Sequence, residues 1–187
     1  SDIMAGDTEM VAYLRRVVGY CMTGEVSEQC LFFLWGTGSN GKSTFTETLM
    51  ALLGALSQKA PAELILRNMR GHEGGASPEV ARLHGCRLAV SSEIDIGRHL
   101  DEAKVKNLTG GDTVTARRLY QDVFDFAPTH KLAIFGNHKP VIRGADEGIW
   151  RRIRLIPFTQ QFSEQAGNCD EGLKEKLSER RAREGLS

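Results

Sequence analysis

Gly36-Thr37-Gly38-Ser39-Asn40-Gly41-Lys42-Ser43 matches the pattern G-x-x-x-x-G-K-[ST] at every defined position. The residues before it, 30–35, form a continuous apolar run, as expected of a strand that is buried on both faces. The residues after it, 42–53, read as a helix that stops at Gly54. A strand, a glycine-rich turn and a helix in this order predict a loop that cradles phosphate with backbone N–H groups and a helix N-terminus.

Each residue of this loop has an expected role toward a nucleotide such as ATP. The Lys42 ammonium is expected to reach the β- and γ-phosphates, where it also counts as a catalytic group. The Ser43 hydroxyl is expected to hold Mg²⁺. The full set of expected nucleotide contacts is Gly36, Thr37, Gly38, Ser39, Asn40, Gly41, Lys42, Ser43 and Thr44.

Apolar strands and amphipathic helices alternate along the rest of the chain. Further strands are expected at 87–91, 131–135 and 152–158, with a short helix before the last of them, and a possible hairpin pairs 113–120 with 123–127. Helices are expected over 7–24, 78–83 and 101–108. This alternation predicts an α/β fold with a largely parallel core sheet.

Polar side chains follow two of these strands. Glu93 comes just after 87–91, and Asn137 comes just after 131–135. Ligands of open α/β sheets sit at the carboxyl ends of the strands, so both residues are expected near the γ-phosphate. Glu93 would orient the attacking water and assist Mg²⁺, while the Asn137 amide would bond both phosphate and water. Asp95 is a second acid in the same place.

Three arginines, Arg151, Arg152 and Arg154, follow closely after Trp150. An arginine inserted beside a γ-phosphoryl group accelerates its transfer by roughly 10³- to 10⁵-fold. Arg151 and Arg152 are therefore candidates for a catalytic arginine. Catalysis requires assembly when such a residue comes from a neighbouring subunit.

The order of these segments resembles the superfamily 3 helicases, specifically the phage and plasmid primase–helicase branch related to the poxvirus primase-helicase. The resemblance covers about 31–158 and rests on the segments 36–44, 91–93, 108–117, 126–132, 136–140 and 146–158. It implies a P-loop, AAA+-like hexameric ring that hydrolyses ATP with Mg²⁺ and moves on single-stranded DNA. Many members of the wider superfamily have two adjacent acids where this chain has Ser92-Glu93.

The same resemblance places DNA contacts on the hairpin that precedes the polar strand. Arginines neutralise phosphates and an aromatic ring stacks on a base, so Arg117, Arg118 and Tyr120 fit this role. Lys104, Lys106 and Lys131 are added as further candidate DNA contacts.

Composition sets bounds on these interpretations. Lys plus Arg equals Asp plus Glu, at 24 each, which argues against a uniformly basic nucleic-acid-coating protein. Residues 98–154 nevertheless carry eleven basic and seven acidic side chains, which suits phosphate contacts on one face. The four cysteines lack metal-ligand spacing and indicate free thiols of a reducing compartment.

The organisation expected from the sequence is a helical segment at 1–27, a motor domain at 28–162 and a helical tail at 163–187. The longest apolar run is too short to span a bilayer, and no signal peptide is visible. The resemblance to phage and plasmid proteins implies the cytoplasm of a bacterial host. Ser1 in place of an initiator methionine suggests excision from a longer chain. The resemblance implies that this longer chain is a primase–helicase with an N-terminal primase region.

Two other functions are alternatives to the ring helicase. A monomeric small-molecule kinase needs a basic lid, for which 143–154 is the candidate, but Glu93 and Asn137 position water instead of a second substrate. An ATP-binding replication accessory or switch module would bind nucleotide without turnover. A GTPase is disfavoured because Asn137-His-Lys-Pro140 lacks the aspartate of N-K-x-D.

Overall fold

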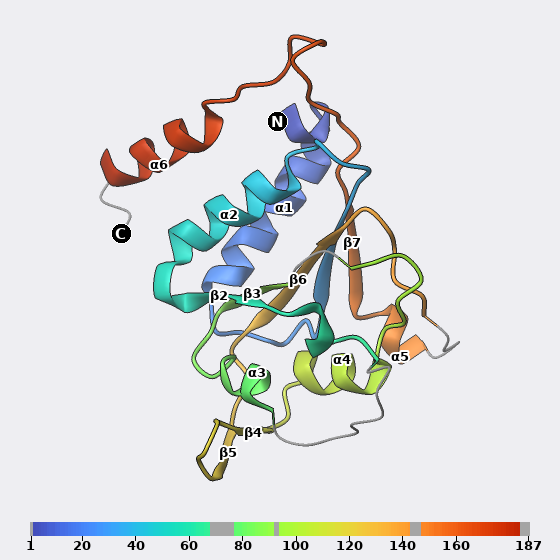
Figure 1. Ribbon diagram of the computed structural model, residues 1–187, viewed down its shortest axis with the longest axis vertical. Helices are drawn as coiled ribbons and strands as arrows, with labels where there is room; N and C mark the ends of the chain where they lie inside the picture. The colour runs from blue at the N-terminus through green and yellow to red at the C-terminus, as the bar shows by residue number, and fades with distance from the viewer. Residues whose placement is uncertain (1, 68–76, 92–93, 143–146, 184–187) are drawn as a thin grey trace.

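A computed structural model describes residues 2–67, 77–91, 94–142 and 147–183 of the protein. Its centre is a five-stranded parallel sheet in the order β2-β3-β6-β1-β7 (Figure 1). The strands are β2 (Ser57–Ala60), β3 (Leu88–Ser91), β6 (Lys131–Gly136), β1 (Leu31–Trp35) and β7 (Ile153–Pro157). The predicted α/β fold with a central parallel sheet is confirmed.

Helices cover both faces of this sheet. The helix α1 (Thr8–Met22) and the helix α2 (Lys42–Leu53) share one apolar cluster with the sheet. The opposite cluster contains side chains of α3 (Pro78–Ala81), α4 (Glu102–Thr109) and α5 (Glu147–Trp150). Figure 1 shows α1 and α2 on one side of the strands, with α4 and α5 on the other. The result is three layers.

The apolar run of β1 explains why the sheet is covered twice. Leu31 and Phe33 pack into the cluster that contains α4, whereas Phe32 and Leu34 pack into the cluster that contains α1 and α2. Successive side chains of a strand point to opposite faces, so a strand that is apolar at every position needs a partner layer on each side. β1 therefore occupies an interior position of the sheet, between β6 and β7.

A separate two-stranded antiparallel sheet joins β4 (Val114–Arg117) to β5 (Val123–Phe126). Val114, Ala116 and Phe126 are buried in the cluster that contains α4, so one face of the hairpin is fixed to the domain. The predicted hairpin is confirmed, but its strands are shorter and its turn longer than expected. Tyr120 belongs to that turn with a left-handed φ of 58° instead of ending the first strand.

His130 lies buried just before β6 and packs beside Phe126, with ring centroids 6.5 Å apart. Burial lowers the pKa of His130 to about 4, because the apolar surroundings disfavour the charged ring. The unfolded chain takes up a proton near the ordinary histidine pKa of 6.5, whereas the folded chain does so only near 4. Stability that is present above the ordinary pKa is therefore lost as the pH falls through this interval.

We expect the free energy of unfolding to fall by roughly 1.4 kcal/mol per pH unit within this interval through His130 alone. Urea unfolding at several pH values checks this expectation. The variant His130→Leu should flatten the pH dependence, and His138→Gln is the matched control for loss of an exposed histidine. An unchanged slope in His130→Leu would contradict the assignment.

Most other predicted elements appear within one or two residues of their expected bounds. α1 begins after the expected N-cap Asp7, whose carboxylate accepts a hydrogen bond from Met10 N. The polar strand β2 was not predicted, and the tail forms a helix only at α6 (Leu173–Arg183). Short 3₁₀ turns, η1 (Asp2–Met4), η2 (Gly54–Leu56) and η3 (Ala62–Leu64), complete the described elements. Within the described residues, no helix is both long and apolar enough to cross a lipid bilayer.

Candidate functional site

The glycine-rich loop 36–41 joins the carboxyl end of β1 to the start of α2, as predicted. Gly38, Ser39 and Gly41 all have positive φ, at 112°, 44° and 81°. Gly36 cannot carry a side chain, because an added Cβ would lie 2.0 Å from Asn40 Nδ2 and 2.3 Å from the Phe158 carbonyl. This tightly wound backbone turns the chain into α2, whose first-turn N–H groups have no partner inside the helix.

Lys42 is the first residue of α2, and its ammonium turns back into the loop. Nζ donates to the main-chain carbonyl of Gly36 at 2.6 Å and to Asn40 Oδ1 at 2.8 Å. It also lies 3.2 Å from Asn137 Oδ1. The side chain is buried, so these bonds hold a positive charge at a defined point beside the loop.

The strand order explains why Asn137 reaches Lys42. β6 lies directly beside β1, with Trp35 opposite Gly136 in the parallel register. Asn137 therefore leaves β6 at the level where the loop leaves β1. The structure thus brings together two residues that are 95 positions apart and that the sequence assigned to one site.

The chain that follows β7 makes hydrogen bonds to the glycine-rich loop. Asn40 Nδ2 donates to the Phe158 carbonyl at 3.1 Å, and Phe162 N donates to the Ser39 carbonyl at 2.7 Å. Gln161 Nε2 donates to Thr37 Oγ1 at 3.2 Å. Sequence analysis missed this contribution of 158–162, although parallel pairing of β7 with β1 requires the following residues to pass the loop.

A hollow of about 270 Å³ opens over the loop and α2. It is lined by Gly38, Ser39, Asn40, Gly41, Lys42, Ser43, Thr44, Phe135 and Asn137. A helix N-terminus, a fixed ammonium and a strongly turned backbone together suit a polyanionic group. Ser43 lies exposed at the start of α2, where a hydroxyl ligand of a phosphate-bound cation would be needed.

Ser92 and Glu93 lie outside the described residues, so the roles predicted for Glu93 remain predictions. The neighbouring main chain is described, and Ile94 N lies close to Gly136. A Cβ added at Gly136 would be 3.7 Å from this nitrogen. Ile94 therefore lies beside the residue before Asn137. Asp95 is exposed, and its predicted assistance to a metal ion is untested.

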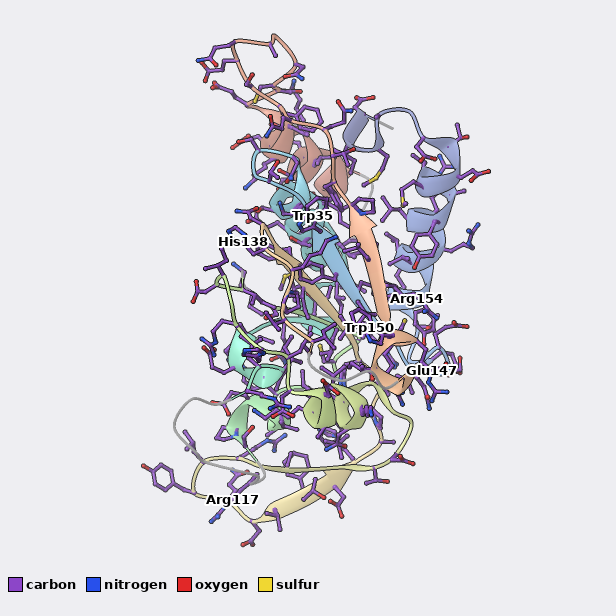
Figure 2. All side chains as sticks on the ribbon, turned by 90° about the vertical axis from the view of Figure 1, so that its right-hand side faces the viewer. Trp35, Arg117, His138, Glu147, Trp150 and Arg154 are labelled. Atoms are coloured by element: carbon purple, nitrogen blue, oxygen red, sulfur yellow. The ribbon has the colours of Figure 1, made fainter. Side chains whose placement is uncertain are left out.

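Arg151 and Arg152 precede β7 and do not share the hollow with Lys42. Arg152 O accepts from Leu31 N at 2.8 Å, so both arginines lie at the amino edge of the sheet. The five residues of β1, about 17 Å of strand, separate this edge from the loop. Figure 2 shows the same separation between Trp35 and the lower group Glu147, Trp150 and Arg154.

The two arginines also differ in surroundings. Arg152 is 8% exposed and donates to the Gly148 carbonyl at 2.7 Å and to Gln29 Oε1 at 3.3 Å. Arg151 is exposed, and its Nη2 lies 3.5 Å from the same Gln29 oxygen. Arg152 therefore supports the fold, while Arg151 faces outward.

The hairpin turn presents a group of exposed side chains at the far end of the molecule from the loop. Tyr120 is fully exposed, and Arg118 stacks over Phe124 with its guanidinium carbon 5.1 Å from the ring centroid. Arg117 Nε donates to the Gln121 carbonyl at 3.0 Å. Figure 2 places Arg117 at the end opposite Trp35 and His138.

The three lysines that are candidates for DNA contact differ in burial and in hydrogen bonding. Lys131 is 2% exposed; its ammonium donates to the Thr23 carbonyl and, at 3.2 Å, to the Glu25 carbonyl. The prediction that Lys131 contacts DNA is therefore wrong, because this ammonium fixes the chain that follows α1. Lys104 Nζ donates to the Leu66 carbonyl at 3.1 Å, and Lys106 is half-buried on the same helix.

Sequence comparison finds related proteins in viruses. The model of a family of unknown function, DUF5906, matches residues 34–152. The chain is 36% identical over 156 residues to "Putative helicase L207/L206" of Acanthamoeba polyphaga mimivirus, covering 83% of the chain but 16% of that protein. It is 26% identical over 153 residues to "Primase D5" of Fowlpox virus, covering 79% of the chain and 19% of that protein.

Solved structures share the fold at low sequence identity. The apo C-terminal region of NrS-1 superposes with a TM-score of 0.59 at 13% identity, over 80% of this chain and 34% of that one. A JCV helicase with a bound small molecule superposes with a TM-score of 0.53 at 14% identity, over 91% of this chain and 46% of that one. The central sheet is therefore an arrangement also found in a helicase domain.

Proposed function

Because the chain belongs to the DUF5906 family, we propose that it is an ATP-driven DNA helicase motor of the superfamily 3 type. It would hydrolyse ATP with Mg²⁺ and move on single-stranded DNA during replication of a viral, phage or plasmid genome. The chain spans about a sixth of its mimivirus relative, so a larger protein with an N-terminal primase region is part of the proposal. Division into residues 1–27, 28–162 and 163–187 likewise remains a proposal.

The observation that carries this proposal is the meeting of Lys42 and Asn137 at the carboxyl edge of the sheet. A P-loop in an AAA+-like motor needs a cation for the phosphates and, beside it, a polar group for phosphate and water. ATP with Mg²⁺ would supply the γ-phosphoryl group and neutralise its developing charge. Loop residues 36–44 would hold the phosphates, and Ser43 would serve the metal ion. Glu93 is proposed as a second group that assists this ion.

We propose assembly into a ring of six subunits, and the position of the arginines supports a site that is shared between neighbouring subunits. Arg151 cannot serve the hollow of its own subunit across the length of β1. A neighbouring subunit is the partner that an exposed arginine at this edge would serve. Arg152 is the weaker candidate because its guanidinium is buried and bonded within the chain.

Phosphate release by the purified chain, with and without a single-stranded oligonucleotide, tests the proposal. A motor predicts turnover that requires Mg²⁺ and rises when the oligonucleotide is added. The second candidate, an ATP-binding replication accessory or switch module, predicts binding of a fluorescent ATP analogue without phosphate release. The hollow over the loop suits the motor and the ATP-binding module equally. The relatives that are named as helicases favour the motor.

Tyr120 is proposed to stack on a base of single-stranded DNA, with Arg117 and Arg118 beside its phosphates. We expect Tyr120→Ala to weaken oligothymidine binding by about 1–3 kcal/mol, since this is the usual effect of removing one stacking ring. Fluorescence anisotropy of a labelled oligonucleotide measures the loss. Met22→Ala, at an exposed apolar residue outside the hairpin, is the control. Equal affinities of the two variants for the oligonucleotide would show that the hairpin does not contact DNA. Lys104 and Lys106 would then be the next residues to replace.

A further inference from the structure

Trp35 is the last residue of β1, and its indole reaches across to the chain that leaves β6. The ladder between the two strands ends where Trp35 lies opposite Gly136. Asn137 is one position past this end. The indole Nε1–H of Trp35 donates to the main-chain carbonyl of Asn137 at 3.2 Å. The side chain thus adds one hydrogen bond beyond the last pair of the ladder.

Lys139 provides a second attachment to the same ring. Its ammonium lies 4.6 Å from the centroid of the Trp35 ring, within the range of a cation–π contact. Lys139 is exposed and follows Asn137 by two residues. Trp35 therefore holds segment 137–139 at two points, one through its N–H group and one through its face.

These contacts bear directly on the direction of the Asn137 side chain. A hydrogen bond to the Asn137 carbonyl fixes the plane of the following peptide, and with it the backbone angle from which the side chain departs. The Asn137 amide oxygen lies 3.2 Å from Lys42 Nζ, and a small rotation of this backbone would break that contact. Trp35 also lies immediately before Gly36, so one residue borders both the loop and the polar strand end.

We propose that Trp35 is a positioning residue, whose indole N–H sets the orientation in which the Asn137 amide faces Lys42 and the hollow. The inference rests on the proposed function, because it concerns the catalytic use of Asn137. It assigns a role to a half-buried tryptophan that otherwise reads as packing against the apolar cluster beneath it. The N–H bond distinguishes the two roles, since packing requires only the ring.

The first test is a double-mutant cycle between Trp35 and Asn137. Trp35→Phe keeps an aromatic ring under Lys139 but removes the donor, and we expect kcat to fall roughly three- to tenfold with KM within about twofold. Asn137→Ala should lower kcat further. The double variant should be no slower than Asn137→Ala alone, because Trp35 acts only through Asn137. Multiplying losses in the double variant would overturn the proposal, as would full activity of Trp35→Phe.

The second test does not depend on turnover. Hydrogen exchange of the tryptophan indole protons is followed by NMR, with Trp150→Phe used to assign the two signals. The Trp35 proton should exchange roughly tenfold or more slowly than a free indole, because it is bonded to a carbonyl. Protection should persist in Lys139→Met, which keeps the donor and acceptor. A Trp35 proton that exchanges freely overturns the positioning role, whereas a protected proton in a protein without turnover contradicts only the proposed motor function.

Discussion

Replacement of Lys42 by methionine is expected to reduce ATP turnover by roughly a hundredfold to a thousandfold, the usual effect of removing one group that stabilises transition-state charge. The apolar side chain has a similar length but cannot donate to phosphate. It also leaves the oxygens of Gly36 and Asn40 without the ammonium that they now bind. Phosphate release and binding of a fluorescent ATP analogue, measured on the same sample, give the size of each loss.

The matched control is Lys174→Met, which removes an exposed ammonium that lies 2.7 Å from Glu47 Oε2. Exposed ion pairs contribute little to stability, so this variant should keep full turnover. Thermal unfolding of both variants separates a catalytic effect from a loss of folding. Unimpaired hydrolysis in Lys42→Met would show that the loop is not the phosphate site.

Arg151→Ala is expected to remove most of the turnover of the assembled protein, by roughly a thousandfold or more, while leaving nucleotide binding intact. A more direct experiment mixes subunits of two inactive variants, Arg151→Ala and Lys42→Met, and measures the turnover of the mixture. An Arg151→Ala subunit keeps an intact Lys42 loop, and a Lys42→Met subunit keeps an intact arginine. Because the two residues lie at opposite edges of the sheet, a mixture of the variants should regain activity that neither has alone.

Arg152→Ala is the comparison variant for this experiment. It should lower the free energy of unfolding by about 1–3 kcal/mol, because its buried guanidinium bonds the Gly148 carbonyl and Gln29. Arg151→Ala should leave stability nearly unchanged. Failure of mixed subunits to regain any turnover, with assembly confirmed by sedimentation, would contradict the assignment of Arg151 to a neighbour's site.

The core of the fold could be predicted because its signals are local. The apolar run of β1, the glycine-rich loop and the helix α2 follow one another, and their order and composition agree on a single local structure. Asn137 was placed correctly because polar residues at the carboxyl ends of parallel strands meet at one edge. That Asn137 and Lys42 meet in one site also depends on β6 lying beside β1.

Elements that depend on tertiary contacts could not be predicted in this way. β2, with the sequence Ser-Gln-Lys-Ala, has no apolar periodicity and forms a strand because β3 offers its free edge. Lys131 reads as one more basic residue, yet its burial follows from the end of α1 lying beside the start of β6. The Trp35–Asn137 bond likewise depends on strand order, which a single sequence does not state.

The distinction between Arg151 and Arg152 is a further example. Adjacent arginines are equivalent in the sequence, and the structure shows that Arg152 is the one whose guanidinium is buried. From the sequence, Arg151 and Arg152 could be assigned only as a pair, within the last segment that carries the resemblance, 146–158. The structure then separated an arginine that bonds within its own chain from one that faces outward.

The central claim is that this chain is a motor whose site is completed by a neighbouring subunit. ATP turnover per subunit, measured against protein concentration in the presence of Mg²⁺ and single-stranded DNA, tests it most directly. The account predicts turnover that climbs with concentration and rises further with DNA, with both effects lost in Arg151→Ala. Robust turnover that is flat in protein concentration and indifferent to DNA would contradict it, because each subunit would then be complete alone.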